Sequence, residues 1–395
     1  MPVNCPVCDS IEILPFLHRA DVPVHQNMLF RRQTDAVAAR RGRLELAVCC
    51  RCGFVFNQAF DQTQMAYSAD YDNTQTCSPC FASYVDKLVA HLLSEARLRN
   101  KRIIEVGCGK GYFLQKLVED ERTGNTGYGF DPSYVGPEVQ RDGRLIVRNC
   151  FFTSEEADTP ADAIVCRHVI EHLPDPIALL ELMRRPLSRT AEPLVVLETP
   201  CVEWILRNQV IWDFYYEHCS YFAADSLATA VQRVGFKPQT VRHVFGEQYL
   251  WLEATIGTSP RLQRSTPPEE IVSLCKTFAA TEKTYIQKWR TKLREVARAG
   301  PVALWGGGAK GVTLANLADP DRKLFVCVVD LNRRKQGCFL PGTGHPIIDY
   351  RDLRSFQVKN VVQMNPNYAT ENLELLHKAG LKVTLIDPAD WREIR

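Results

Sequence analysis

The sequence predicts an α/β protein: a doubly wound parallel sheet, preceded by a small cysteine-containing domain and followed by a second, Rossmann-like α/β domain. Strand-like and helix-like stretches alternate over residues 76–260 and again over 301–395. A glycine-rich loop follows the first strand of each region, and two C-x2-C pairs occur within residues 1–75. We therefore expect three domains at 1–75, 76–260 and 301–395, with a linker and a bridging helix over 261–300.

The composition is that of an ordinary globular protein. Of 395 residues, 45% are hydrophobic and 24% are charged, and the formal net charge is +2, whereas a dedicated nucleic-acid binder is usually more basic. The N-terminus, MPVNCPVCDS, lacks the basic and apolar regions of a signal peptide, and no apolar run is long enough for a transmembrane helix. We expect a cytoplasmic protein that acts on a small molecule, without a nucleic-acid or membrane partner; the oligomeric state is left open.

The N-terminal cysteines indicate a metal site. Because the N-terminus lacks a secretory signal, we interpret the 15 cysteines as thiols or metal ligands and not as disulfides. The alternative to a metal site is that these are free cysteines buried as small hydrophobic side chains. Two C-x2-C pairs, each placing two thiolates on one tetrahedral ion, predict a structural Zn²⁺ bound by Cys5, Cys8, Cys49 and Cys52. A third pair, Cys77 and Cys80, remains a competing ligand pair.

The regular elements follow from hydrophobic patterning. Residues 1–75 show no long periodic element, so we expect an irregular segment there. The residues TSPRLQRSTPPEE predict a linker that ends near 270, and one apolar face predicts a helix over 269–298 that packs on one of the two α/β units. The predicted strands are 102–106, 126–130, 162–166 and 194–198 in the first α/β unit, and 301–305, 324–329, 360–364 and 382–386 in the second.

The first glycine loop, in IIEVGCGKGYFLQKL, lies between a strand and a helix. It carries Glu105, Gly107, Gly109 and Gly111, and glycines let the backbone approach a ligand closely. Asp131 ends the next strand, where a carboxylate can accept the two ribose hydroxyls of a nucleoside. The spacing differs from the G-x-G-x-x-G of dinucleotide sites; the alternative is a loop that serves only the tight turn.

This E-x-G-x-G-x-G loop, together with ADAIVCRHVIEHLPDP at residues 161–176, resembles the class I S-adenosylmethionine methyltransferases. The resemblance implies that S-adenosylmethionine is the cofactor, held by Glu105, the glycines and Asp131. It also implies that Arg167 and His168 lie over its methionine end.

The segment DFYYEHCSYF, residues 213–222, follows a strand that ends at Glu198-Thr199-Pro200. Loops after parallel strands gather at the carboxyl edge of the sheet, so this segment is expected at the cofactor cleft. His218 could titrate near neutral pH and Glu217 could orient it, while Phe214 and Phe222 are expected to pack in the core. The alternative for His218 is a hydrogen-bonded core residue.

The order of zinc knuckles, methyltransferase core with Y-x-E-H and C-terminal α/β domain resembles the sugar C-methyltransferases of deoxysugar biosynthesis, over nearly the whole chain. The resemblance implies methyl transfer to a ring carbon next to the ketone of a nucleotide-linked 4-keto-hexose. It carries site roles to Tyr215, Glu217, His218, Tyr71 and His172, with His218 as the base and Tyr215, Tyr71 or His172 as donor to the enolate oxygen. The segment YDNTQ, residues 71–75, departs from the Tyr-x-Ser-Ser-like pattern of that family, which leaves the acceptor open.

The second glycine loop, in VALWGGGAKGVTLAN, has the form G-x-G-x-x-G. Read alone, with Asp330 at the end of the next strand, it predicts an NAD site, whereas Lys310 at a helix start could bind a phosphate. The resemblance assigns this domain to substrate binding, and the remaining alternative is a unit that only closes the cleft. The predicted substrate-binding residues are Gly306, Gly308, Lys310, Gly311, Asp330, Asn365 and Tyr368.

Four functions therefore remain open from the sequence. The first is a zinc-containing C-methyltransferase of a nucleotide-linked keto-deoxysugar. The second is a methyltransferase of another small-molecule acceptor, at carbon, nitrogen or oxygen. The others are a zinc-ribbon RNA-binding module with inert α/β domains, which the near-neutral charge disfavours, and an NAD oxidoreductase.

Overall fold

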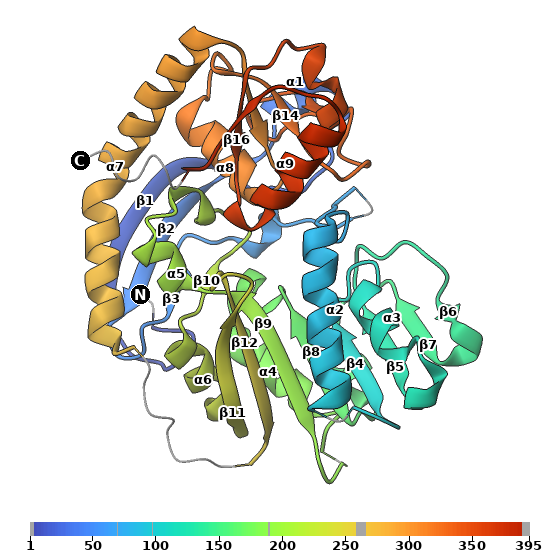
Figure 1. The fold of residues 1–395 in the computed structure, drawn as a ribbon. Coiled ribbons are helices and arrows are strands. Elements are labelled where there is room, and N and C mark those ends of the chain that lie inside the picture. The colour runs from blue at the N-terminus through green and yellow to red at the C-terminus, as the bar shows by residue number, and fades with distance from the viewer. Residues whose placement is uncertain (1–3, 69, 97, 189, 258–265, 389–395) are drawn as a thin grey trace.

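The computed structural model describes residues 4–68, 70–96, 98–188, 190–257 and 266–388, which form three β-sheets (Figure 1). The first part of the predicted linker, residues 258–265, lies outside the described residues. Within the part of the chain that is described, no helix is both long and apolar enough to span a bilayer.

The N-terminal segment forms a four-stranded antiparallel sheet, so the expectation of an irregular segment was wrong. Its order is β1(Ile13–Pro23), β2(Arg41–Cys49), β3(Val55–Asn57) and β10(Ser220–Tyr221), with the short helix α1(Gln33–Val37) between β1 and β2. Pro15 and Pro23 and two register shifts interrupt the period-two pattern of β1, which hid the strand in the sequence. Because β1 is an edge strand, it tolerates both prolines. The fourth strand, β10, comes from the 213–222 segment, and Ser220 pairs with Phe56.

The second sheet has eight strands in the order β11-β12-β9-β8-β4-β5-β7-β6. The predicted parallel sheet is present in its central strands: β4(Arg102–Val106), β5(Thr126–Phe130), β7(Leu145–Arg148), β8(Ala163–Arg167) and β9(Leu194–Pro200). The sheet is nonetheless mixed, since antiparallel strands flank this centre: β6(Val139–Gln140), β11(Phe236–Val244) and β12(Tyr249–Ile256).

Helices cover both faces of this sheet because its central strands are apolar on both sides. Ile103 of β4 packs in a cluster with α2 and α3, whereas its neighbour Ile104 packs in a cluster with α4 and α6 (Figure 1). The helices are α2(Pro79–Ser94), α3(Tyr112–Val118), α4(Pro176–Arg184), α5(Val202–Arg207) and α6(Ala224–Arg233). Two 3-10 helices carry residues discussed below, η5(Ile170–His172) and η6(Ile211–Asp213).

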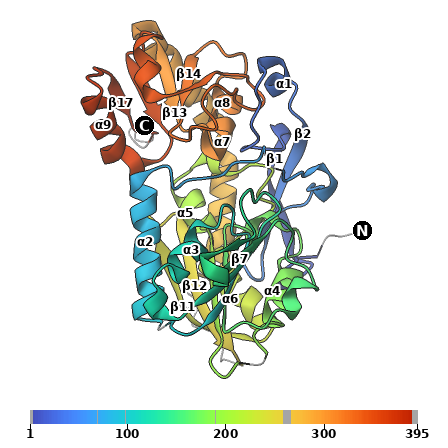
Figure 2. The same cartoon turned by 90° about the vertical axis from the view of Figure 1, so that its right-hand side faces the viewer.

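The third sheet is parallel, five-stranded and C-terminal, in the order β15-β14-β13-β16-β17. The four strands predicted for this region agree with the structure within two residues. Its elements are β13(Val302–Trp305), α8(Ala309–Ala318), β14(Phe325–Val329), β15(Ile347–Ile348), β16(Asn360–Gln363), α9(Ala369–Lys378) and β17(Thr384–Ile386). Figures 1 and 2 show this unit at one end of the molecule, with the eight-stranded sheet at the other.

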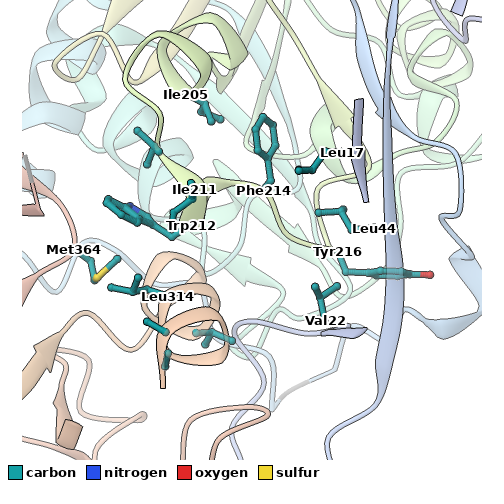
Figure 3. Close-up of a cluster of buried hydrophobic side chains, with 14 of the residues drawn as sticks. Leu17, Val22, Leu44, Ile205, Ile211, Trp212, Phe214, Tyr216, Leu314 and Met364 are labelled. Carbon is teal, nitrogen blue, oxygen red and sulfur yellow. The ribbon is translucent and has the colours of Figure 1, made fainter. Parts of the chain in front are cut away.

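The predicted long helix is α7(Pro268–Ala299), and it contacts more than the single α/β unit that the sequence suggested. It packs on β1 and β2 of the N-terminal sheet and also on α5 and α8. One buried apolar cluster therefore joins all three units (Figure 3). The cluster includes Leu17, Leu44, Ile205, Ile211, Trp212, Phe214, Phe278, Trp289, Leu314 and Met364.

A buried ion pair lies beside this cluster. Arg19 of β1 pairs with Glu282 of α7 at 2.6 Å, and the two side chains are 6% and 9% exposed. The same guanidinium donates to the carbonyl oxygens of Ile211 at 2.6 Å and Phe214 at 2.7 Å. Arg19 thus fixes the backbone directly before Tyr215.

We expect Arg19→Ala to lower the free energy of unfolding by about 3–5 kcal/mol, because it leaves the Glu282 charge and two carbonyl groups buried without a partner. Denaturant unfolding measures this change. The matched control is Arg43→Ala, since Arg43 pairs with Glu45 at the surface, 65% and 35% exposed, and should contribute less than about 1 kcal/mol. Equal losses in the two variants would contradict a structural role for the buried pair.

Candidate active site

A first cavity lies at the carboxyl ends of β4, β5 and β8. Its lining includes Glu105, Gly107, Gly109, Asp131, Arg167 and His168, which are the predicted cofactor residues apart from Gly111. Gly111 instead begins α3 as its N-cap, with a φ of 78°. At Gly107, whose φ is 68°, an added Cβ would lie 2.1 Å from Val169 Cγ2, so both the backbone and the space require glycine.

The two carboxylates of this loop hold its shape. Glu105 is buried and accepts the N–H of Leu114 at 3.1 Å; burial raises the pKa of Glu105 to about 8, although the Arg167 charge opposes this. Asp131 accepts the N–H of Gly109 at 2.8 Å and both the N–H and the hydroxyl of Ser133, at 2.7 and 2.6 Å. Asp131 therefore ties the end of β5 to the glycine loop.

Arg167 and His168 belong to a buried ionic network around Glu198 of β9. Arg167 Nε lies 2.5 Å from Glu198 Oε2, and His168 lies 3.5 Å from Glu198 and 3.4 Å from Glu171. Burial opposes ionisation of His168, but the charges of Glu198 and Glu171 outweigh it and raise its pKa to about 9. Burial likewise opposes ionisation of Glu198, yet Arg167 and His168 lower its pKa to about 2. The network is therefore ionised at neutral pH.

A second cavity lies between the eight-stranded sheet and the C-terminal unit. It contains all the predicted substrate residues, Gly306, Gly308, Lys310, Gly311, Asp330, Asn365 and Tyr368, and also Tyr215, Glu217 and His218. The two cavities adjoin, because both are lined by Tyr71, Asn73, Thr74, Gln75, His168 and His172. These six residues form a wall that the two cavities share.

The 213–222 segment divides between core and cavity. Phe214 and Phe222 are fully buried, as expected, and Tyr216 is buried against the N-terminal sheet, where its ring contacts the position of Gly42. The intervening residues, Tyr215 and Glu217, line the second cavity. This alternation of core and cavity side chains continues until His218.

Glu217 does not orient His218, contrary to the expectation that the two form a pair. Its Oε2 accepts the hydroxyl of Tyr71 at 2.9 Å and its Oε1 accepts the N–H of Gln26 at 2.6 Å. Adjacent residues on this extended segment point to different partners, so the Glu217 carboxylate fixes Tyr71 and the N-terminal segment.

His218 is instead next to Tyr215. Its Nε2 lies 3.1 Å from the Tyr215 hydroxyl, and the side chain is buried at the cavity. Burial, and secondarily the charges of His172, His168 and Lys310, lower the pKa of His218 well below its usual 6.5. Burial, followed by the charge of Asp213, raises the pKa of Tyr215 well above 10. At neutral pH the pair is a neutral imidazole and a protonated phenol.

A hydrogen bond fixes one ring nitrogen of His172. Its Nδ1 lies 3.0 Å from the Glu217 carbonyl oxygen, which can only accept, so Nδ1 carries a hydrogen. The Tyr67 hydroxyl lies 3.2 Å from the same nitrogen, and the His172 and His218 rings are 4.7 Å apart. Tyr67 also lines the first cavity and was not identified from the sequence.

Lys310 lies at the start of α8, as predicted, but its charge is already paired. Its Nζ donates to Asp213 Oδ2 at 2.7 Å and to Gln248 Oε1 at 3.0 Å. Asp330 accepts the N–H groups of Gly307 and Asn332 at 2.9 and 2.8 Å. Lys310 thus links the second glycine loop to Asp213, which lies two residues before Tyr215.

Four cysteine thiols converge at the end of the N-terminal sheet. Cys5 and Cys52 sulfurs are 3.6 Å apart, and Cys8 and Cys49 sulfurs are 3.5 Å apart. A tetrahedral ion with metal–sulfur bonds of about 2.3 Å separates its ligands by about 3.8 Å, so these residues fit a Zn²⁺ ion. The Cys5 and Cys52 thiols lower the pKa of Cys49, and backbone N–H groups also favour its thiolate.

The third cysteine pair is not part of this cluster. Cys77 lines the second cavity and is exposed, and Cys80 lies in the first turn of α2, where its thiol contacts the Asn367 carbonyl oxygen. Among the described residues, the cysteine cluster with metal-ligand spacing comprises Cys5, Cys8, Cys49 and Cys52.

Two family models match the chain over regions that agree with this geometry. A methyltransferase domain matches residues 81–241, which include the glycine loop, Asp131, Arg167 and His168 of the first cavity, and a C-methyltransferase C-terminal domain matches residues 270–382. These domains identify an S-adenosylmethionine-dependent methyltransferase. Together they support, at the level of the family, a C-methyltransferase.

The methyltransferase resembles two kinds of curated protein. A tRNA U34 carboxymethyltransferase from Nautilia profundicola is 31% identical over 117 residues, which are 27% of this chain and 36% of that protein. The chain thus spans little more than a third of that relative. The C-methyltransferase NovU from Streptomyces niveus is 23% identical over 363 residues, which are 87% of this chain and 85% of that protein.

Among solved structures, a 1,6-didemethyltoxoflavin-N1-methyltransferase from Burkholderia thailandensis contains bound 1,6-didemethyltoxoflavin and S-adenosylhomocysteine. It is 17% identical, covers 44% of this chain and 79% of its own, and has a TM-score of 0.35.

The His168 network predicts a pH dependence of stability. The pKa of His168 is about 9 in the folded protein and about 6.5 when unfolded, so its contribution is fully present below pH 6.5 and is lost as the pH rises through about 9. We expect the excess stability of the wild type over His168→Asn to fall by about 3 kcal/mol between pH 6.5 and 9.5. Asparagine suits this position because it tolerates the φ of 55°.

Urea unfolding at the two pH values measures this difference. His243→Asn, a change at an exposed position of β11, is the control and should give a difference that does not vary over this range. A difference between wild type and His168→Asn that stays constant with pH would contradict the ionised network.

Proposed function

We propose that the protein methylates a carbon next to a ketone of a nucleotide-linked keto-deoxysugar, through an enolate formed by a protein base. The observation that carries this proposal is the shared wall of the two cavities, which brings a neutral histidine and a protonated tyrosine next to the cofactor cavity. The C-terminal domain match and the similarity to a C-methyltransferase over 87% of the chain support transfer to carbon.

The first cavity would hold S-adenosylmethionine, which supplies an electrophilic methyl group on a sulfonium. Asp131 would accept ribose hydroxyls, Glu105 and the glycine loop would shape the adenosyl site, and Arg167 and His168 would lie at the methionine end. Because the Glu198 network already fixes both cationic side chains, they need no reorganisation when the cofactor binds.

Proton removal is assigned to His218. A carbon next to a ketone is weakly acidic, so a base must accept its proton while the developing oxyanion is stabilised. The acceptor carbon loses its proton to the His218 imidazole and forms a bond to the methyl carbon, as the sulfur–methyl bond breaks and S-adenosylhomocysteine remains. With Nε2–H directed to the Tyr215 oxygen, the Nδ1 lone pair of His218 is available for the proton.

The hydrogen-bond pattern supports Tyr215 as the donor to the enolate oxygen. Of the three candidates, Tyr71 already donates its hydroxyl to Glu217. His172 donates its Nδ1–H to the Glu217 carbonyl oxygen. The hydroxyl hydrogen of Tyr215 is free to donate if its oxygen accepts from His218. Tyr71 and His172 then shape the wall between the two substrates.

We expect His218→Ala to lower kcat by roughly 10²–10⁴-fold without changing the affinity for S-adenosylhomocysteine, because a positioned base accelerates only the proton transfer. Turnover of a panel of nucleotide-linked 4-keto-hexoses, with product mass and NMR, measures the rate and locates the methyl group. Since the pKa of His218 lies well below 6.5, kcat/KM of the wild type should not fall between pH 8 and 6.5.

The enolate step has an independent readout. With S-adenosylhomocysteine in place of the methyl donor, the wild type should exchange the acceptor's α-hydrogen for solvent deuterium, and His218→Ala should not. The matched control is His243→Ala, an exposed histidine outside both cavities. Undiminished turnover in His218→Ala, or a methyl group on oxygen or nitrogen, would exclude this mechanism; the latter would favour a different small-molecule acceptor.

We further propose that Cys5, Cys8, Cys49 and Cys52 bind one structural Zn²⁺. Four thiolates leave no open position for a substrate, so the ion would stabilise the N-terminal sheet. We expect about one zinc per chain by atomic emission, and loss of that zinc in Cys8→Ser. The adjacent residue provides the control, since Cys50→Ser should retain the metal; full zinc content in Cys8→Ser would refute this ligand set.

A further inference from the structure

Three side chains with metal-ligand chemistry converge on one wall of the second cavity. A carboxylate oxygen of Glu171 and one ring nitrogen each of His172 and His218 all lie within 4.8 Å of one another. All three residues line this cavity, and the two imidazole rings are 4.7 Å apart at an interplanar angle of 90°. In the described part of the chain, the other group with this spacing is the four-cysteine cluster.

Main-chain contacts bring these three residues together. Glu171 and His172 are the last two residues of η5, whereas His218 belongs to the 213–222 segment. The carbonyl oxygen of Glu171 accepts the N–H of Cys219 at 3.0 Å, so the two segments are joined directly beside the three side chains. The convergence is therefore part of the fold and does not depend on side-chain rotamers alone.

Glu171 has a buried carboxylate oxygen without a hydrogen-bond partner. The side chain is 1% exposed, and its Oε2 accepts the hydroxyl of Thr199 at 3.0 Å. No hydrogen bond from a described residue reaches Oε1, although His168 Nδ1 forms an ion pair with it at 3.4 Å. Because a buried carboxylate oxygen is normally satisfied by donors or by a cation, Oε1 indicates a missing partner at this wall.

The two histidines are oriented as metal-binding histidines usually are. His172 donates its Nδ1–H to the Glu217 carbonyl oxygen at 3.0 Å, and His218 Nε2 lies 3.1 Å from the Tyr215 hydroxyl. A histidine ligand commonly hydrogen-bonds through one ring nitrogen, and this contact orients the other nitrogen toward the ion. The atoms left for a metal are therefore Nε2 of His172 and Nδ1 of His218, together with Oε1 of Glu171.

This set of donors favours a transition metal of the zinc type. Two imidazole nitrogens and one carboxylate oxygen suit Zn²⁺ and Co²⁺, whereas Mg²⁺ and Ca²⁺ prefer oxygen ligands. A tetrahedral ion with bonds of about 2.0–2.1 Å separates its ligands by about 3.3 Å, so the three atoms would approach by at most about 1.5 Å. Three protein ligands leave the fourth position of the ion open.

We propose that Glu171, His172 and His218 form a second metal site, separate from the four cysteines, which takes a divalent transition metal such as Zn²⁺. The ion would occupy the Nδ1 lone pair of His218 that proton removal requires. One lone pair cannot bind a metal and accept a proton at once, so the metal inhibits the enzyme reversibly. The site stands without the proposed function, whereas the inhibition rests on it.

Cobalt absorption spectroscopy tests the site in the full-length protein whose cysteine cluster already holds Zn²⁺. We expect about one equivalent of added Co²⁺ to bind with a visible spectrum that lacks thiolate charge-transfer bands, and Mg²⁺ should not compete. His172→Gln and Glu171→Gln should each weaken this binding at least about tenfold. The matched control is His243→Asn, an exposed position outside both cavities, which should leave cobalt binding unchanged.

The inhibition is measured on turnover and on deuterium exchange. Zn²⁺ should suppress both reactions of the wild type, and a brief chelator treatment that leaves the cysteine-bound zinc in place should restore them. The half-inhibiting Zn²⁺ concentration should rise at least about tenfold in His172→Gln, measured against the metal-free rate of that variant. Unchanged affinity for S-adenosylhomocysteine shows that a variant is folded.

The outcomes separate the metal site from the proposed function. No cobalt binding beyond the cysteine cluster, or binding that both glutamine variants leave unchanged, would overturn the site. Binding at the three residues with undiminished or faster turnover would support the site and overturn the inhibition, since a base other than His218 would then act. Cobalt binding as expected, in a protein that methylates no keto-sugar of the panel, would support the site and reject the proposed function together with the inhibition.

Discussion

The position of the proposed base depends on one constraint: the segment from Ile211 to Phe214 has to be held by three units at once. Arg19 binds two of its carbonyl oxygens from the N-terminal sheet, and Glu282 of α7 neutralises Arg19. Lys310 binds Asp213 from the C-terminal unit. The same residues contribute Trp212 and Phe214 to the shared apolar cluster (Figure 3). His218 is therefore placed by contacts that no single unit could make alone.

The features that could be predicted from the sequence depend on residues that are close together in the chain. The contacts that were missed join residues that are far apart in the chain. The central strands, the glycine loops and α7 follow from periodicity and from turn residues within about 30 positions. The partners of Glu217 are 146 and 191 residues away, and the buried Lys335 donates to Asn27, 308 residues away. The motif Tyr-x-Glu-His therefore marked a segment that lines the second cavity, but the partner expected for Glu217 was wrong. Lys335 stands among Arg333, Arg334 and Gln336, where nothing in the sequence separates it from solvated charges.

The two cavities use opposite electrostatic arrangements. On the cofactor side, Glu198 balances Arg167 and His168, so buried charges are fixed before any ligand arrives. On the acceptor side, His218 is kept neutral by burial and by the cationic groups around it, and Tyr215 is kept protonated. A histidine base must be neutral to accept a proton. A tyrosine that stabilises an oxyanion must be protonated, because its hydroxyl has to donate a hydrogen bond. The ionised network near the shared wall thus contributes to both conditions.

The departure of residues 71–75 from the pattern of the sugar C-methyltransferases has a structural consequence. Asp72 does not line either cavity; it is buried and binds Asn332 at 2.9 Å and Arg334 at 2.7 Å, in the loop that carries Lys335. Its neighbours Asn73, Thr74 and Gln75 line both cavities. Asp72 fixes one end of this wall to the Lys335 loop and so helps to position the wall, whereas the three following residues line the cavities themselves. Acceptor selectivity is therefore to be sought at residues 73–75, where the two cavities adjoin.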